Sequence, residues 1–248
     1  MKVVVIGGTG LIGSKVVAAL TEHGHEAVAA SPSTGVDTLT GEGLAEALAG
    51  ASVVVDVTNS PSFADDAVLD FFRRSTEQQL KAENEAGVAH HVALSVVGTD
   101  RLQAIGYFRA KQTQEDMIRE SGVPFSIVRA TQFFEFAQGL ADSATQDGTV
   151  VAAPIKIQPI FSGDVAAAVA RTAVGAPVNG IVEVAGPDTF AFEDFLRKGL
   201  AVQGDPRPVV TEPQGLYWGA ALQESDLLAG PDASIGGTSL AEWSARQA

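Results

Sequence analysis

The chain has 248 residues, of which 46% are hydrophobic, and a formal net charge of −14 at pH 7. This acidity argues against nucleic acid and against an anionic membrane surface as partners, because both are bound by clustered Lys and Arg. The absence of cysteine excludes disulfides, thiolate nucleophiles and cysteine-based metal sites.

Two further features narrow the class of protein. The histidines His23, His25, His90 and His91 have no acid-rich ligand spacing around them, so no metal site is expected. The N-terminal apolar run is short and leads straight into glycines, unlike a secretory signal or a membrane span. We therefore expect a cytoplasmic protein.

Short apolar runs alternate with longer amphipathic segments through the first half of the chain. Strands are predicted over residues 3–7, 25–31, 51–60, 90–98 and 124–130, and helices over 11–24, 41–50, 63–87 and 107–121. This alternation predicts an α/β fold with a doubly wound parallel sheet. In such a sheet the carboxyl ends of the strands share one edge, where ligands bind.

The pattern loosens after residue 130. A strand entering a helix is predicted over 158–174, a strand over 180–186 and a helix over 191–202. The last 45 residues or so show no clear period. The interpretation is a core over 1–130, followed by a mixed region over 131–248 that completes the sheet and forms a small C-terminal substrate annex.

A glycine-rich loop, "GGTGLIG", separates the first strand from the first helix. In a dinucleotide site Gly7 permits the tight turn, Gly10 lets the backbone approach a pyrophosphate, and Gly13 lets the helix pack on the strand. The helix N-terminus then presents N–H groups to the phosphates. A purely structural turn is the alternative. The expected cofactor contacts in this loop are Gly7, Thr9, Gly10, Leu11, Ile12 and Gly13.

The end of the second strand bears on which nicotinamide cofactor is bound. An acidic residue there would hold the ribose hydroxyls of NAD and repel the 2′-phosphate of NADP. The chain instead has Ser31, Ser33 and Thr34, with no carboxylate before Asp37 and no arginine nearby. NADP is therefore favoured over NAD. Two interpretations of Asp37 stay open: it contacts the edge of the adenine ring, or it is an ordinary loop aspartate.

Thr58 and Asn59 follow the third strand in "DVTNSP". At the rim of the sheet they are placed to line the cofactor cleft. As turn residues before a proline they also have a purely structural explanation, so both interpretations stay open.

The stretch "YFRAK" places Tyr107 and Lys111 four residues apart, on one face of a helix. Ser95 lies at the end of the preceding strand, twelve residues earlier. A packed ring beside a solvated ammonium is the structural alternative to a catalytic set.

With "GGTGLIG", "ALSVVG" and "YFRAK" in this order, the chain resembles the short-chain dehydrogenase/reductase superfamily. The stretches "PFSIVRATQFFEF" and "QPIFSGDVAAAVA" are similar to its atypical, NmrA-like NAD(P)-binding branch. The resemblance implies a Rossmann-like NAD(P)-binding core. It also implies an NAD(P)-dependent oxidoreductase that moves hydride between the nicotinamide and a small carbonyl, alcohol or activated alkene.

The resemblance also implies roles for three residues. Tyr107 would donate its phenolic proton to the substrate. Lys111 would favour the phenolate by its charge and hold the nicotinamide ribose. Ser95 would donate a hydrogen bond to the carbonyl oxygen, where negative charge develops.

The segment after the fifth strand, "RATQFFEF", is expected over the nicotinamide end. Thr131, Gln132 and Phe133 are placed to touch the substrate or the carboxamide, while Phe134 and Phe136 form either an apolar wall or part of the core. The expected partner is a small-molecule substrate, and the sequence predicts no oligomeric state. The alternative function is a non-catalytic, NmrA-like NAD(P)-binding redox sensor that acts through a protein partner.

Overall fold

A computed structural model describes residues 1–247. The chain divides into two compact units, each assembled from separate stretches. Unit 1 comprises Met1–Ser95, Gly106–Arg129 and Val165–Val182. Unit 2 comprises Val96–Ile105, Ala130–Asp164 and the chain from Glu183 onward.

The elements that lie wholly or mainly in unit 1 are β1 (Lys2–Ile6), α1 (Gly13–Glu22), β2 (Glu26–Ala30), η1 (Pro32–Thr34), α2 (Leu44–Leu48), β3 (Val53–Asp56), α3 (Asp65–Ala86), β4 (His90–Val96), α4 (Gly106–Glu120), β5 (Phe125–Ala130) and α6 (Ser162–Val174). The remaining elements are η2 (Phe134–Phe136), α5 (Ala137–Ser143), β6 (Thr145–Gln146), β7 (Thr149–Ala152), β8 (Lys156–Ile157), β9 (Gly180–Ala185), β10 (Phe190–Ala191), α7 (Phe192–Gln203), β11 (Val209–Thr211), β12 (Ser234–Ile235) and α8 (Leu240–Ala245).

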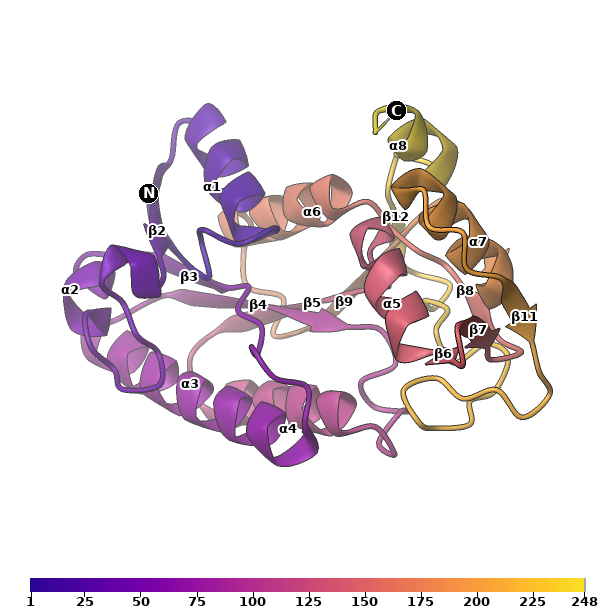
Figure 1. Cartoon of the computed structure of the whole chain (residues 1–248). Helices are drawn as coiled ribbons and strands as arrows, with labels where there is room; N and C mark the ends of the chain where they lie inside the picture. The colour runs from indigo at the N-terminus through magenta and orange to yellow at the C-terminus, as the bar shows by residue number, and fades with distance from the viewer. Residues whose placement is uncertain (248) are drawn as a thin grey trace. The chain divides into compact units, whose positions relative to one another are not determined.

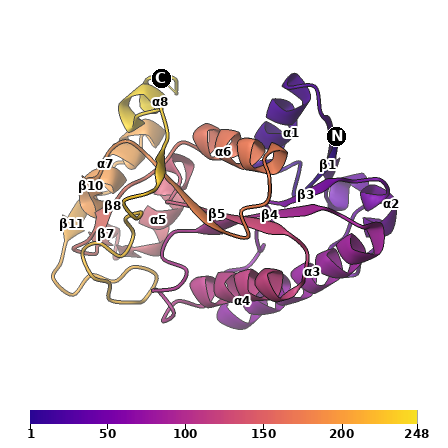
Figure 2. The ribbon, with the colours of Figure 1, turned by 180° about the vertical axis from the view of Figure 1, so that it is seen from behind.

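The main sheet has seven strands in the order β12-β9-β5-β4-β3-β1-β2 and is mostly parallel. In unit 1, α3 and α4 cover one face of the sheet, while α1 and α6 cover the other (Figures 1 and 2). This is the doubly wound arrangement that the alternating pattern predicted. The expected α/β fold, with its Rossmann-like core, is confirmed.

Burial on both faces explains why the central strands are continuous β-branched runs. Val4, Ile6 and Val54 pack in one cluster with Leu44 and Leu48 of α2. Every residue of β3 is buried. These strands therefore contribute to the core on both sides of the sheet.

The expected elements of unit 1 are present with small shifts at their ends. Helix α3 begins at Asp65, with acidic residues in its first turn, and ends at Ala86. Its C-cap, Gly87, takes the left-handed conformation at φ 68°. The expected helix over 41–50 is shorter, at Leu44–Leu48. Gly43, at φ 73°, precedes its first residue.

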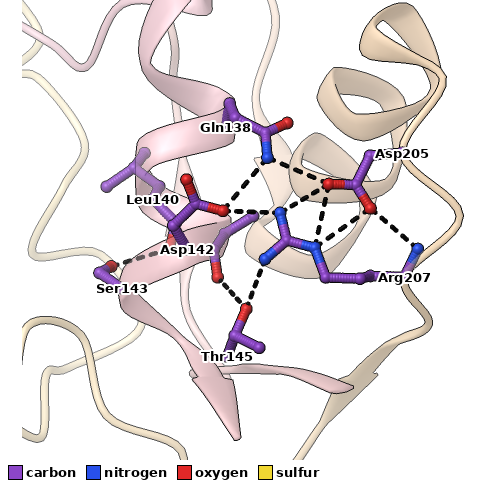
Figure 3. Close-up of polar contacts among 8 residues, drawn as sticks. Gln138, Leu140, Asp142, Ser143, Thr145, Asp205 and Arg207 are labelled. Carbon is purple, nitrogen blue, oxygen red and sulfur yellow. Dashed lines mark hydrogen bonds and ion pairs between the residues drawn. The ribbon is translucent and has the colours of Figure 1, made fainter. Parts of the chain in front are cut away.

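Unit 2 contains two small sheets, β11-β7-β6 and β10-β8, beside α5 and α7. Arg207 lies at the centre of a polar cluster that joins these elements (Figure 3). Its guanidinium bonds to Asp205 and to Asp142, both at 2.7 Å, and donates to Thr145 at 2.8 Å. Hydrogen bonds from the Arg207 guanidinium, from the Arg207 backbone N–H and from Gln138 hold the pKa of Asp205 well below its usual range.

The C-terminal segment holds order that its sequence pattern did not predict. Helix α8 begins with a capping box, in which Ser239 Oγ accepts from the Glu242 N–H while the Glu242 carboxylate accepts from the Ser239 N–H. Leu240 and Trp243 are its buried residues. No helix within residues 1–247 is long and apolar enough to cross a membrane.

Candidate functional site

The glycine loop of unit 1 depends on its glycines for backbone reasons. Gly7 has a φ of +79°, a conformation that residues with a Cβ rarely adopt. A Cβ on Gly13 would lie 2.1 Å from the Gly7 carbonyl oxygen. On Gly10 it would meet the same oxygen at 3.3 Å. Gly13 is thus required for packing. Gly10 has no such clash, and its missing side chain leaves the loop backbone uncovered.

The N-terminus of α1 is open to an anion. Ile12, its N-cap, makes no side-chain cap, and the first turn has no acidic residue. Ile12 is buried, while Thr9 and Leu11 are exposed. The positive end of a helix dipole beside a glycine turn suits a diphosphate.

The exit of β3 borders this loop. A Cβ on Gly7 would lie within 3.1–3.2 Å of the backbone of Val57 and Thr58. The Thr58 hydroxyl oxygen is buried and has no hydrogen-bond partner among residues 1–247, so it is available to a ligand. Asn59 is exposed, and its side-chain oxygen accepts from the Ser60 N–H at 3.0 Å. The close approach of the glycine loop to the exit of β3 and the unpaired Thr58 hydroxyl both fit a bound dinucleotide.

The turn after β2 carries the hydroxyl groups expected to select the cofactor. Ser31 Oγ and Ser33 Oγ share a hydrogen bond at 2.9 Å, and Ser33 is exposed. Thr34 Oγ1 instead accepts from the Ser31 N–H at 2.9 Å and closes the turn. Asp37 accepts from the Leu39 N–H at 2.7 Å, which is a local turn bond.

Tyr107 lies on α4 in an aromatic cluster. Its ring is 5.6 Å from that of Phe63 and 6.0 Å from those of Phe72 and Phe108, measured between centroids. Burial raises the pKa of Tyr107 to about 12. The phenol is therefore a weaker acid than an exposed tyrosine, and the lowering of its pKa that was expected from Lys111 is not found.

Lys111, one turn further along α4, is buried with its ammonium inside unit 1. Nζ donates to the Leu94 carbonyl at 2.8 Å and to Gln114 Oε1, and it lies 4.4 Å from the centroid of Phe72. Burial lowers the pKa of Lys111 to about 8, against the Asp56 and Glu115 carboxylates, which raise it. Lys111 and Tyr107 thus contact the same Phe72 ring.

Ser95 Oγ donates to Glu115 Oε1 at 2.6 Å. The same carboxylate accepts from Arg129 at 2.9 and 2.8 Å and from Arg119 at 2.9 Å. Glu115 and Arg129 are buried. Arg129 therefore pairs with a carboxylate, and the hydroxyl proton of Ser95 points to Glu115.

We expect Arg129→Met to lower the free energy of unfolding by about 3 kcal/mol, because it leaves the buried Glu115 carboxylate with less compensation. Urea denaturation measures this loss. Arg119→Met is the matched control: its side chain is 33% exposed, so removing it should cost less than about 1 kcal/mol. Equal losses for the two variants would contradict the assignment of Arg129–Glu115 as the dominant pair.

In unit 2, the segment Thr131–Phe133 has a fixed backbone and unsatisfied side chains. Thr131 N–H donates to the Val184 carbonyl at 3.0 Å, and the Gln132 carbonyl accepts from the Ile160 N–H at 2.9 Å. The Thr131 hydroxyl and both side-chain amide atoms of Gln132 are buried without hydrogen-bond partners in the described chain. Buried polar groups are normally paired, so these atoms suit a polar ligand.

The aromatic residues of the same segment divide between surface and interior. The ring of Phe133 stacks on that of Phe136 with centroids 5.2 Å apart, and Phe136 is exposed. Phe134 is buried, with its centroid 5.7 Å from that of Trp243. Phe134 is therefore a core residue of unit 2.

A buried polar network around Lys111 was not anticipated from the sequence. The network residues that were not among the predicted site residues belong to β3, β4, α3 and α4. They are Asp56, Gln79, Glu83, His91, Gln114 and Glu115. Two features could have indicated it: the lone carboxylate of Asp56 in a β-branched run, and polar residues three and four positions after Lys111.

Comparisons with known proteins agree with this geometry. Residues 7–174 match a protein family described as NAD(P)H-binding. A (4-alkanoyl-5-oxo-2,5-dihydrofuran-3-yl)methyl phosphate reductase from Streptomyces griseus is 28% identical over 222 residues, which cover 82% of this chain and 74% of that protein.

Solved structures show the same fold at low identity. A dTDP-glucose 4,6-dehydratase from Streptomyces venezuelae, a double mutant with NAD bound, superposes with a TM-score of 0.75 at 16% identity, covering 100% of this chain and 96% of that one. A UDP-glucose 4-epimerase from Thermus thermophilus, in complex with NAD, gives 0.68 at 19% identity, with 92% of each chain covered.

Proposed function

This chain belongs to the NAD(P)H-binding family, and we propose that it is an NAD(P)-dependent reductase of a small molecule with a carbonyl or an activated double bond. The observation that carries the proposal is Tyr107, a protonated phenol packed one helical turn from the buried cation of Lys111. The 28% identical relative is itself named a reductase, which supports this direction of reaction.

The residues proposed to hold the dinucleotide belong to unit 1. Gly7, Gly10 and Gly13 and the open turn of α1 would take the diphosphate. Thr58 and the turn at Ser31 would take polar groups of the nucleosides. A bound reduced nicotinamide supplies the hydride. The protein supplies the orientation and the proton.

We assign the proton to Tyr107 Oη. A positioned proton donor typically contributes 10² to 10⁴ in rate. Lys111, one helical turn further along α4, would supply the positive charge that favours the phenolate left after donation. Ser95 would support the substrate oxygen once its hydroxyl rotates away from Glu115, because its single O–H now donates to that carboxylate.

The substrate class is proposed from polar atoms and from the relative's substrate. In unit 2, Thr131 and Gln132 offer a hydroxyl and a complete amide, which can donate to and accept from a polar substrate. Phe133, stacked on Phe136, offers an apolar surface. The relative's substrate is a dihydrofuranone, a ring with an alkene conjugated to a carbonyl, so unsaturated lactones are the first class to test.

Two measurements test the proposed function. A thermal-shift screen with NAD, NADP and their reduced forms should show stabilisation by at least one nucleotide, since a ligand of the folded state raises the melting temperature. Oxidation of the reduced nicotinamide is then followed with unsaturated lactones and small carbonyl compounds. No shift with any of the four nucleotides would exclude the proposal.

One observation favours a second function, a nucleotide-binding redox sensor. Both Ser95 and Lys111 use their polar hydrogens inside unit 1, on Glu115, Leu94 and Gln114. A sensor would bind oxidised and reduced nucleotide with unequal affinity. It would consume no reduced cofactor with any compound of the screen.

We propose NADP as the preferred cofactor, because the turn after β2 offers hydroxyls and no carboxylate at Ser31 and Ser33. Ser33→Asp should weaken NADP binding by about tenfold or more, since a carboxylate repels the 2′-phosphate, and should leave NAD binding equal or stronger. Isothermal titration with both nucleotides measures the ratio. Ser33→Asn introduces a side chain of the same shape as aspartate but without its charge, and it should change the ratio of the two affinities little. A preference for NAD in the unsubstituted chain would reverse this assignment.

A further inference from the structure

Asp56, the last residue of β3, is a buried carboxylate with partners on two helices. Its Oδ2 accepts from Gln79 Nε2 of α3 at 3.1 Å and from Gln114 Nε2 of α4 at 2.8 Å. Asp56 and both glutamines are almost fully buried. A carboxylate removed from water at this depth has to be compensated by hydrogen bonds and by a nearby positive charge.

The compensating charge is on Lys111. The amide of Gln114 connects the two groups: its nitrogen donates to Asp56, and its oxygen accepts from Lys111 Nζ. The amide fixes the direction of both bonds, because only its nitrogen donates and only its oxygen accepts. Carboxylate, amide and ammonium thus form one chain of hydrogen bonds from β3 to α4.

The second oxygen of Asp56 faces the glycine loop. Oδ1 accepts from the Thr58 N–H at 2.9 Å and fixes the turn by which the chain leaves β3. This turn lies against Gly7, whose Cβ position is 3.2 Å from the Thr58 nitrogen. The Asp56 carboxylate therefore has two roles. It fixes the turn that borders the glycine loop, and through the Gln114 amide it positions Lys111.

We propose that Asp56 is a positioning residue for Lys111: acting through the Gln114 amide, its carboxylate fixes the place of the ammonium and keeps it charged. The inference rests on the proposed function, in which the charge on Lys111 supports proton donation by Tyr107. Asp56 itself has no role at the reacting atoms. It sets the charge state of the group beside them.

Several other titratable groups lie around Lys111. On α4 these are Glu115, which Arg129 of β5 and Arg119 also bind, and the phenol of Tyr107. From β4 comes His91, whose Nδ1 lies 2.9 Å from both oxygens of Glu83 on α3. The Glu83 carboxylate raises the pKa of His91. His91→Gln therefore serves as a background in which this second titration is absent.

The first test measures Lys111 directly in the nucleotide-free chain. Lys111 is the only buried lysine within residues 1–247, so its side-chain ¹³Cε resonance should be distinct, and Lys111→Met assigns it. With a pKa of about 8, the ammonium loses its proton as pH rises through that value. Asp56→Asn removes the negative neighbour and should lower this midpoint by about one pH unit or more.

The second test measures turnover against pH. The alkaline limb of the reductase profile should fall near pH 8 and should move to lower pH in Asp56→Asn by the same interval as the lysine midpoint. A merely structural role would lower activity equally at every pH. A chain without turnover would refute the proposed function and leave the lysine titration as an independent test of Asp56.

A second-site variant provides the rescue. Asp56→Asn combined with Gln114→Glu returns one carboxylate next to Lys111 and should restore the midpoint to within about half a unit. Should Asp56→Asn fail to fold, Gln114→Met breaks the same chain while keeping Asp56, and should also lower the midpoint. A lysine midpoint that stays at its original value in the folded variants, or a double variant without rescue, overturns the proposal.

Discussion

Tyr107→Phe should reduce turnover by about 10² to 10⁴ while leaving nucleotide affinity unchanged. The substitution removes the proton that we assign to the reaction, and a positioned proton donor is worth this much in rate. The ring keeps its contacts with Phe63, Phe72 and Phe108, so folding stability should change by less than about 1 kcal/mol. Oxidation of reduced nicotinamide gives the rate, and a nucleotide titration gives the affinity.

The matched control uses the only other tyrosine of the chain. Tyr217 lies in unit 2 with its ring 5.6 Å from that of Phe192, and we assign it no proton. Tyr217→Phe should keep turnover within about threefold. If Tyr107→Phe turns over at the original rate, the phenol has no part in the reaction.

Gly13→Ala should abolish nucleotide binding and destabilise unit 1. The new methyl carbon would lie 2.1 Å from the Gly7 carbonyl oxygen and 2.7 Å from the Gly8 Cα. Both are backbone atoms of the turn that we propose to receive the diphosphate, so the loop has to move. Overpacking of this kind costs about 1–3 kcal/mol, and we expect an affinity loss of at least roughly 100-fold, equivalent to about 2.8 kcal/mol. Thermal denaturation and calorimetric titration measure the two effects.

Two other glycines separate packing from binding. The methyl group of Gly10→Ala would meet only the Gly7 oxygen, at 3.3 Å. This variant should therefore keep the melting temperature and weaken only the binding of the nucleotide. Gly139 in α5 has no neighbour within 4 Å of its Cβ position, so Gly139→Ala should leave nucleotide binding unchanged and should keep or raise the melting temperature. If Gly13→Ala binds nucleotide as the unsubstituted chain does, the loop is not the diphosphate site.

The parts of the fold that the sequence predicted are those governed by short-range patterns. β-branched runs such as Val3–Val5 and Val53–Val55 predicted buried parallel strands because strands covered on both faces need apolar side chains at every position. The glycine loop was readable for a similar reason, since a positive φ at Gly7 and a close contact at Gly13 each demand one residue type.

The polar network around Lys111 could not be read in this way. Gln114 and Asp56 are 58 positions apart, and their bond depends on where α4 crosses β3. At the level of sequence Lys111 is equally compatible with a solvated ammonium. Its burial follows only from the close packing of α3 on α4.

One feature of the C-terminal part could have been predicted from the sequence, and another could not. The capping box of Ser239 and Glu242 was visible in the sequence as a Ser followed three positions later by Glu. Strands such as β12 have only two residues and exist through pairing with β9, so no local period could show them.

The interleaving of the two units has a consequence for synthesis on the ribosome. Unit 1 includes Val165–Val182, so this unit remains incomplete until residue 182 has left the exit tunnel. Until β9 emerges, β5 is an unprotected sheet edge, open to pairing with another nascent chain. A fragment that ends at residue 130 would carry this edge permanently and should aggregate, whereas one that extends through β9 covers it.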